Sequence, residues 1–373
     1  MVGDALRQQL LALSREIHAD PELAYQEHRA VGRIAALLER HGHAVERGVG
    51  GLETAFRCRA GPAGAAVVLL AEYDALPDVG HGCGHNLIAM SNVGAFLIAA
   101  EADRLQAGIE LLGTPAEESG GGKLDLLEAG AFKEAVAVLS SHPGGIEWSI
   151  GSTTLGVVSK RIAYHGLASH AAVSPEKGRN ALNAVIRLFV AVDGWRQHLP
   201  SDARIHGIIT NGGAAQNIVP SFAEAVFGMR SKDGGTLAEM VETFGKIAEG
   251  AALQTGTTVE ITDEMRLYQP TTAEPTLTRL LVESVGQRGP AAKTGELVFA
   301  STDLGNVSQA VPTSAIGFPV ADEPIAGHSI AMTKASVGDL GHANALICAE
   351  ALAEVAVRVA TDAQLRGSLR TPS

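Results

Sequence analysis

Aromatic residues are scarce in this chain: phenylalanine, tryptophan and tyrosine together make up 4% of it, although 46% of the residues are hydrophobic. The core must therefore be built mainly from alanine, valine, leucine and isoleucine, which suits alanine-rich helices packed on valine-rich strands. At 373 residues the chain is longer than the roughly 100–200 residues that are typical of one domain. We therefore expect two domains.

The chain also lacks a basic excess, a cysteine framework and long apolar runs. Its 41 acidic residues outnumber 29 basic ones, giving a formal net charge of −12, whereas nucleic-acid binding needs a basic surface. Cys58, Cys83 and Cys348 are too few and too irregularly spaced for a disulfide framework, which favours a reducing compartment. No run of about 18 apolar residues could span a membrane, and the N-terminus does not resemble a signal peptide. The sequence therefore predicts a cytoplasmic protein that binds neither nucleic acid nor membranes.

Apolar runs typical of buried strands alternate with segments expected to be helical along the first part of the chain. The expected strands are residues 65–72, 109–113 and 135–140, and the expected helices are residues 4–40 with a break at Asp20-Pro21, 86–100 and 123–129. This alternation indicates a mainly parallel sheet covered by helices, in which sites gather outside the carboxyl ends of the strands. The polar residues expected to follow these strands are Asp74, Cys83, Glu117, Glu118 and His142.

The pattern changes near residue 155. Strands are expected at residues 154–164, 204–209 and 223–230, and helices at residues 180–192 and 236–252. A β-α-β-β-α-β order over about 110 residues is typical of a small ferredoxin-like domain. Because α/β alternation returns after Pro270, the sequence predicts an α/β fold in which a large catalytic domain (1–155 and 269–373) is interrupted by a small α+β domain (156–268).

Two short motifs carry the chemistry. The first, His81-Gly-Cys-Gly-His85, places a thiol and an imidazole two residues apart among glycines. The second, Thr114-Pro-Ala-Glu-Glu-Ser-Gly-Gly-Gly122, places two adjacent carboxylates before a glycine run. Sulfur, nitrogen and carboxylate oxygen are ligands of a borderline-soft divalent metal such as zinc. Neighbouring glutamates also allow one to bind metal while the other moves protons. Together the motifs favour a metal-dependent hydrolase.

Each candidate also has a plainer interpretation. Cys83 could be a small buried hydrophobe or a cysteine-hydrolase nucleophile, although no family-specific cysteine signature surrounds it. His85 and His142 could be structural histidines, and Glu117 and Glu118 could be helix-surface acids. Their places in glycine- and proline-rich loops favour ligand roles instead.

These segments, in this order, resemble the aminoacylase-type family of co-catalytic metallo-amidohydrolases. The family includes carboxypeptidase G-type enzymes and the hydrolases of indole-3-acetyl-amino acids, hippurate and p-aminobenzoyl-glutamate. The branch with the β-alanyl-lysine dipeptidases is nearest. The resemblance covers nearly the whole chain and is carried by these segments: His18–Leu23, Glu72–Pro77, Gly80–Ala89, the paired glutamates, Gly166–Leu182, Gly213–Arg230 and Gly327-His328. At position 72, where many members carry histidine or aspartate, this chain has glutamate.

The resemblance implies a metal centre in the large domain. Cys83 resembles the ligand that bridges two metals. The other ligands implied are His85, Glu118, His142 and His328. Glu117 resembles the general base that deprotonates the metal-bound water, and Asp74 resembles the carboxylate that orients a metal-site group. Because a thiolate bridge is softer than a carboxylate, zinc and manganese both stay open.

The resemblance also implies roles in the small domain. His170 resembles the histidine that reaches across a homodimer to stabilise the tetrahedral oxyanion. Asn217 and Arg230 match positions that hold the carboxylate or carbonyl of the substrate. By sequence alone His170 and His328 are ambiguous loop histidines, and Arg230 could form a structural salt bridge with a nearby acid such as Glu224 or Asp233.

We therefore expect metal-dependent hydrolysis of the amide bond of N-acyl or N-aminoacyl amino acids. The expected protein carries two divalent ions per subunit, zinc or manganese, and forms a homodimer through its small lid domain. Two alternatives stay open: a catalytically silent binding protein on the same fold, and a thiol hydrolase that uses Cys83. The intact set of candidate ligands speaks against the first, and activity that survives metal removal would identify the second.

Overall fold

An eight-stranded sheet lies at the centre of the larger of two units into which the chain divides in this computed structural model, which describes residues 2–370. The larger unit comprises the residues up to Thr153, Thr271–Val298 and those from Thr302 onward, and the smaller comprises Thr154–Pro270 with Phe299–Ser301. The boundaries expected from the sequence, 156 and 268, fall within two residues of this division.

The large sheet has the order β1-β2-β4-β3-β5-β14-β6-β12. Its strands are β1 (Val45–Arg47), β2 (Phe56–Ala60), β3 (Ala66–Ala71), β4 (Gly108–Gly113), β5 (Ala135–Pro143), β6 (Trp148–Ile150), β12 (Ala292–Thr294) and β14 (Thr313–Phe318). The central strands β4, β3, β5 and β14 run parallel, whereas β1, β2 and β4 pair antiparallel, as do β14 and β6. The sheet is therefore mainly parallel, as the sequence predicts.

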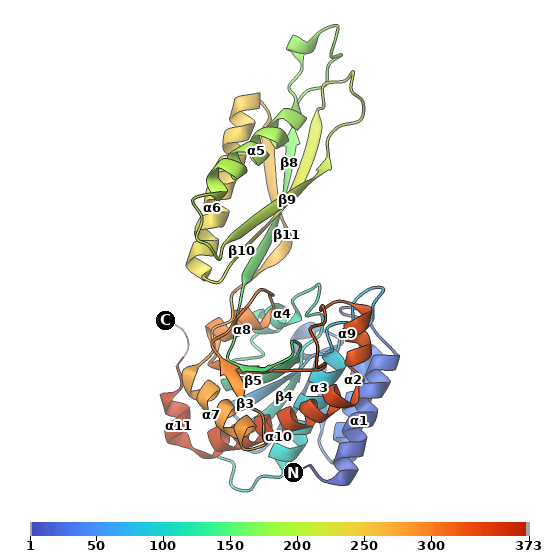
Figure 1. Ribbon diagram of the computed structural model, residues 1–373, viewed down its shortest axis with the longest axis vertical. Helices are drawn as coiled ribbons and strands as arrows, with labels where there is room; N and C mark the ends of the chain where they lie inside the picture. Colours follow the sequence, from blue (N-terminus) through green and yellow to red (C-terminus); the bar gives the residue numbers. More distant parts are fainter. Residues whose placement is uncertain (1, 371–373) are drawn as a thin grey trace. The chain divides into compact units, whose positions relative to one another are not determined.

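Helices cover both faces of this sheet (Figure 1). They are α1 (Asp4–Ala19), α2 (His28–Arg40), α3 (His85–Ala100), α4 (Gly122–Glu128), α7 (Pro275–Gly286), α8 (Leu304–Ala310), α9 (Ile330–Ala335), α10 (Asp339–Thr361) and α11 (Ala363–Ser368). A short 3₁₀ helix, η1 (Val49–Gly51), precedes β2, and β7 (Thr153–Thr154) pairs with β13 (Leu297–Val298) in a separate two-stranded sheet. Among the helices of the described residues, none is long and apolar enough to cross a membrane.

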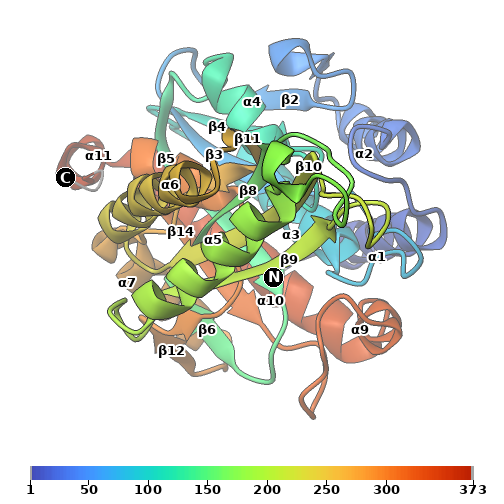
Figure 2. The same ribbon diagram turned by 90° about the horizontal axis from the view of Figure 1, so that it is seen from above.

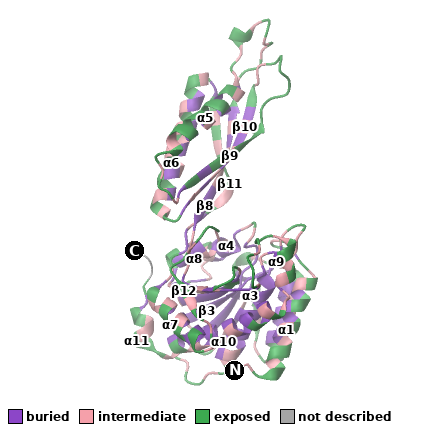
Figure 3. Ribbon diagram, viewed as in Figure 1, coloured by how far each residue is buried: buried purple, intermediate pink, exposed green. Residues whose placement is uncertain are grey.

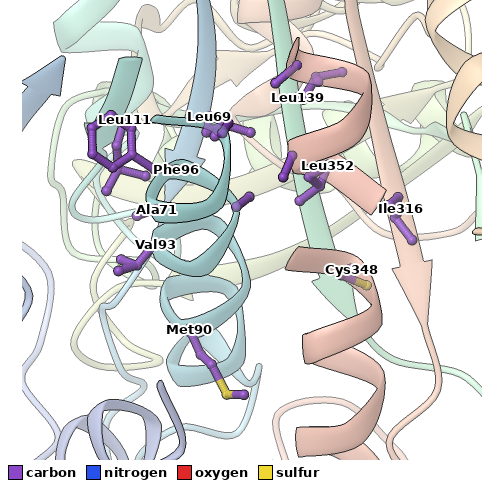
Figure 4. Packing of buried hydrophobic residues seen from close by; sticks show 14 of the residues in the cluster. Leu69, Ala71, Met90, Val93, Phe96, Leu111, Leu139, Ile316, Cys348 and Leu352 are labelled. Atoms are coloured by element: carbon purple, nitrogen blue, oxygen red, sulfur yellow. The ribbon is translucent and has the colours of Figure 1, made fainter. Parts of the chain in front are cut away.

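Strand β3 shows why the sequence takes this layered form. All six of its residues are buried (Figure 3). Alternate side chains point to opposite faces of a strand, so Val67 and Leu69 pack with the α3 and α10 side, while Val68 and Leu70 pack with α4 and α8. In the first of these layers, Met90 and Phe96 of α3 and Leu352 of α10 lie over the sheet (Figure 4). A strand that is covered on both faces needs an unbroken apolar run.

The smaller unit is an antiparallel sheet of order β11-β8-β10-β9 with two helices. Its elements are β8 (Gly156–His165), η2 (Pro175–Lys177), α5 (Ala181–Arg196), β9 (Arg204–Asn211), β10 (Phe222–Ser231), α6 (Gly234–Thr255) and β11 (Thr258–Tyr268). The helices α5 and α6 lie side by side in both views (Figures 1 and 2). Asn180 and Asp233 cap them by accepting hydrogen bonds from the backbone N–H groups of Asn183 and Thr236. The ferredoxin-like order is thus confirmed.

Two local expectations need correction. Strand β5 extends to Pro143, so His142 lies within the strand rather than after it. The segment 4–40 forms two helices separated by residues 20–27, a wider break than the Asp20-Pro21 pair alone indicates.

Candidate metal centre

The loop from β3 to α3 positions the cysteine–histidine motif at the carboxyl end of the sheet. Gly84 precedes α3 with a φ of 81°, a left-handed conformation that glycine adopts without strain. A Cβ at this position would lie 2.6 Å from Cγ of Pro143. The glycine therefore lets the loop turn tightly against the end of β5, so that Cys83 and His85 flank the turn.

The paired glutamates lie in a strained turn after β4. Ala116 has a φ of 58°, unusual for a residue with a Cβ, and its N–H donates to Oε1 of the buried Glu27 at 2.9 Å. A Cβ on Gly122 would lie 2.0 Å from the carbonyl oxygen of Pro115, so only glycine fits there. The turn brings Glu117 and Glu118 to the same edge of the sheet as Cys83.

Every candidate ligand in the large unit meets at this edge. Nε2 of His85 lies 3.7 Å from Oε1 of Glu118 and 3.9 Å from Oε2 of Glu117. Sγ of Cys83 lies 3.5 Å from Nε2 of His142, and Nε2 of His328 lies 3.3 Å from Oε2 of Glu118. Three donor sets result, each with its donor atoms within 4.8 Å of one another: Cys83, His85 and His142; Cys83, Glu118 and His328; His85, Glu117 and Glu118.

Hydrogen bonds leave the metal-binding atoms of these side chains available. Asp74 accepts from Nδ1 of His85 at 2.9 Å and from the backbone N–H of Glu118 at 3.0 Å. Nδ1 of His142 donates to the carbonyl of Pro143 at 2.8 Å. Each ring therefore presents Nε2. Among the described residues, the buried Nε2 of His85 and Oε1 of Glu118 have no hydrogen-bond partner. These atoms, with a thiol, imidazoles and carboxylates around them, fit a borderline-soft divalent ion.

The electrostatics also favour a cation. Burial raises the pKa of the Cys83 thiol to about 12, and the negative charges of Glu118 and Glu117 add to the rise, although His85 opposes it. Burial, followed by the charges of Glu72 and Asp303, raises the pKa of Glu117 well above its usual value. An added positive charge would relieve both effects by stabilising the thiolate and the carboxylate.

The other three predicted residues belong to the small unit. His170 forms an isolated β-bridge with Ile218, and the carbonyl of Asn217 accepts from the backbone N–H of Ala171 at 2.9 Å. Nη1 of Arg230 donates to Oγ of Ser301 at 2.9 Å. The two acids considered as salt-bridge partners of Arg230 are engaged otherwise: Glu224 pairs with Arg161, and Asp233 caps α6. The substrate roles of His170, Asn217 and Arg230 stay predictions.

The structure places further charged residues beside the site that the sequence motifs do not indicate. Lys123, predicted only as the start of a helix, is wholly buried and pairs with Asp303 at 2.5 Å and Glu72 at 2.8 Å. Its signal was a lysine at the second residue of α4, directly after the glycine run. Asp303 has no comparable local signal because only the fold brings it to Lys123.

Comparisons with known proteins extend over most of the chain. A model of the peptidase family M20/M25/M40 matches residues 68–353. The chain is 37% identical to the Xaa-Arg dipeptidase of Mus musculus over 95% of this chain and 86% of that protein. It is 33% identical to one of the subunits of p-aminobenzoyl-glutamate hydrolase from Escherichia coli (strain K12) over 69% of this chain and 58% of that protein.

Solved structures share the fold. A Bacillus subtilis protein described as a dinuclear metal binding peptidase from the M20 family aligns with a TM-score of 0.76 at 19% identity, covering 96% of this chain and 99% of that one. An aminobenzoyl-glutamate utilization protein from Klebsiella pneumoniae aligns with a TM-score of 0.68 at 18% identity, covering 95% of this chain and 97% of that one.

The chain therefore belongs to the peptidase family M20/M25/M40. It is a metal-dependent hydrolase of amide or peptide bonds, which confirms the family and the enzyme class predicted from the sequence. The catalytically silent alternative is not favoured.

Proposed function

We propose that the chain holds two divalent ions per subunit, zinc or manganese, and hydrolyses the amide bond of N-acyl or N-aminoacyl amino acids. One observation carries the pair of ions: Cys83 belongs to two of the three donor sets, one with His85 and His142 and the other with Glu118 and His328. These two sets share no other residue and together contain all five proposed ligands, so Cys83 can bridge two ions.

Glu117 is the proposed general base. When bound, divalent ions at this site supply Lewis acidity, which polarises a carbonyl and makes water a stronger nucleophile. Glu117 lies beside the ligand Glu118, with its Oε2 3.9 Å from Nε2 of His85. From there it takes the proton of the attacking water and delivers it to the leaving amine. Asp74 keeps Nδ1 of His85 protonated and its ring fixed, so that Nε2 faces the site.

The proposed substrates carry a free carboxylate on the leaving amino acid. Arg230 is the proposed anchor, with Asn217, since a planar guanidinium can grip a carboxylate through two hydrogen bonds. Names of the relatives support this class: an Xaa-Arg dipeptide and a p-aminobenzoyl-glutamate both end in an amino acid.

We further propose a cytoplasmic homodimer in which the small unit serves as lid and dimerisation domain and His170 completes the site of the partner subunit. The edge strand β9 supports this pairing, because its Ile208 and Ile209 side chains are 65% and 46% exposed. An exposed apolar edge strand is a template for pairing with another chain.

The thiol-hydrolase alternative finds no support in the electrostatics. A thiol whose pKa is raised to about 12 is protonated at neutral pH and is a poor nucleophile. Metal removal tests the proposal. The chelated protein should lose activity toward dipeptides ending in arginine, p-aminobenzoyl-glutamate and N-acyl amino acids, and should regain it with zinc, manganese or cobalt. Full activity after exhaustive chelation, retained in Cys83→Ala, would contradict the metal mechanism.

A further inference from the structure

A buried ion cluster lies directly behind the metal centre. Lys123 is 0% exposed, and its Nζ contacts Oδ1 of Asp303 at 2.5 Å and Oε1 of Glu72 at 2.8 Å. The backbone N–H of Lys123 also donates to Oδ2 of Asp303 at 3.0 Å, so both oxygens of Asp303 are engaged by one residue. With one cation and two anions, the cluster keeps one negative charge that its own members do not neutralise.

The unneutralised end of the cluster is Oε2 of Glu72. This atom is buried and has no hydrogen-bond partner among the described residues, and it lies 3.6 Å from Nε2 of His85, which also has none. Nδ1 of His85 faces Asp74 at 2.9 Å, so Nε2 is the ring nitrogen that a neutral His85 offers to an ion. Leaving a buried polar atom without a hydrogen-bond partner is unfavourable. A cation between Oε2 of Glu72 and Nε2 of His85 would satisfy both.

The spacing also suits a shared ion. Two donors that each lie about 2.0–2.2 Å from one ion in a tetrahedral arrangement are roughly 3.3–3.6 Å apart. Glu72 lies closer to Nε2 of His85, at 3.6 Å, than do the carboxylates of Glu118 and Glu117, at 3.7 and 3.9 Å.

We propose that Glu72 is an additional ligand of the ion that His85 holds: its Oε2 faces the ion, while Lys123, fixed by Asp303, holds Oε1 in place. This inference rests on the proposed function, since it requires that the centre binds metal. The plainer alternative is that Glu72 serves only as the ion-pair partner of Lys123.

Metal affinity and the spectrum of the cobalt-loaded protein separate these possibilities without any activity assay. The full chain is stripped of metal, titrated with Co²⁺ against a chromophoric chelator, and its visible absorption is recorded. Glu72→Gln keeps an acceptor for Lys123 but loses the anionic ligand. It should weaken binding of one ion by more than the roughly 10–100-fold that is typical when a group that only supports a ligand is lost, and should change the cobalt spectrum.

Glu110→Gln is the matched control. The Glu110 side chain is 5% exposed, as is that of Glu72, and it pairs with a cation, Arg57, at 2.9 Å. Circular dichroism on both variants guards against misfolding. A second variant, Glu72→Asp, keeps the charge but withdraws the carboxylate by one methylene, and it should also weaken binding.

Cobalt affinity and spectra of Glu72→Gln that match those of Glu110→Gln would overturn the proposal, and so would a Glu72→Asp variant that binds as the wild type does. A wild-type chain that binds no metal would overturn the proposed function itself, and this inference with it.

Discussion

The two units of the molecule differ most in what they bury. Among the described residues, every buried acidic or basic side chain belongs to the large unit: Glu22, Glu27, Glu72, Asp74, Glu110, Glu117, Lys123, Glu274 and Asp303. The buried polar side chains of the small unit are only Ser231 and Thr257. Because burying charge is costly unless it is paired, its concentration in one unit indicates where the fold gives up stability for chemistry.

The small unit, by contrast, buries apolar side chains and keeps its charges at the surface. Its core is a cluster of apolar side chains from both helices and the inner face of the sheet, and its ion pairs, such as Lys160 with Asp263 and Arg161 with Glu264, are solvent-exposed. Exposed pairs contribute about 0–1 kcal/mol each. Residues in this unit should therefore act on the reaction through contacts with the substrate or its transition state, and changes to its core should affect stability alone.

The largest expected effect comes from removing the proton acceptor in the large unit. Glu117→Gln keeps the shape of the side chain but cannot accept a proton, so kcat should fall by about 10²–10⁴-fold while metal content is unchanged. Steady-state kinetics and metal analysis on the same samples measure both. Glu118→Gln is the comparison variant and should lose metal instead. If the two variants exchange phenotypes, the assigned roles of the glutamates are reversed.

A core substitution in the small unit should separate stability from metal binding. Phe227 is fully buried on β10, with its ring 4.6 Å from that of Phe189 and 5.1 Å from that of Phe244, measured between centroids. Phe227→Ala should lower the free energy of unfolding by about 3–5 kcal/mol, seen by denaturant titration, with unchanged metal affinity. Phe96→Ala, in the core of the large unit, is the comparison variant for the loss in free energy of unfolding. Lost metal affinity in Phe227→Ala at temperatures where it is folded would break the distinction between the units.

A somewhat smaller effect is expected from the small unit's histidine. His170→Ala should lower kcat by about 10²–10³-fold, as for removal of one oxyanion donor, without loss of metal. Mixing it with Glu117→Gln subunits should restore part of the activity, because a hybrid dimer contains one intact composite site. His165→Ala, in the same unit, is the control. No recovery after verified subunit exchange would place His170 in its own subunit's site or outside the mechanism.

A structural feature of this protein can be predicted from the sequence when neighbouring residues along the chain determine it. The apolar run of β3 and the apolar, alanine-rich run of α3 predict a buried strand and a helix that covers the sheet, because burial on both faces of the sheet requires such runs. The short strands β1, β6 and β12 have only three residues each. A three-residue segment carries no periodicity, so these outer strands of the sheet could not be predicted.

The residues of the metal centre and its surroundings also differ in whether the local sequence indicates them. Cys83, His85, Glu117 and Glu118 lie in glycine-rich motifs whose residue types indicate the chemistry directly. The cluster of Lys123 with Asp303 does not, because 180 residues separate its members along the chain and only the tertiary fold brings them together.

The smallest expected effect tests whether burial, rather than membership of the large unit, decides the importance of a charge. Asp20 lies in the large unit, but its side chain is 33% exposed. It accepts two hydrogen bonds from Arg29, at 2.6 and 2.7 Å, and one from Arg33, at 2.6 Å. These hydrogen bonds, those from Arg29 first, lower the pKa of Asp20 from 3.8 to about 2. A carboxyl whose pKa is lower in the folded than in the unfolded protein stabilises the fold above the unfolded value, and that contribution is lost as pH falls through the folded one.

Asp20→Asn should therefore lower the melting temperature slightly at neutral pH, with the difference from wild type shrinking as the pH falls from about 4 toward 2. Metal affinity should not change. Asp103→Asn, which alters an exposed acid before β4, is the control for the loss of one negative charge. Thermal melts across this pH range measure the difference. A loss of stability as large as that of Phe227→Ala would mean that exposed ion pairs, and not only buried charges, hold the large unit together.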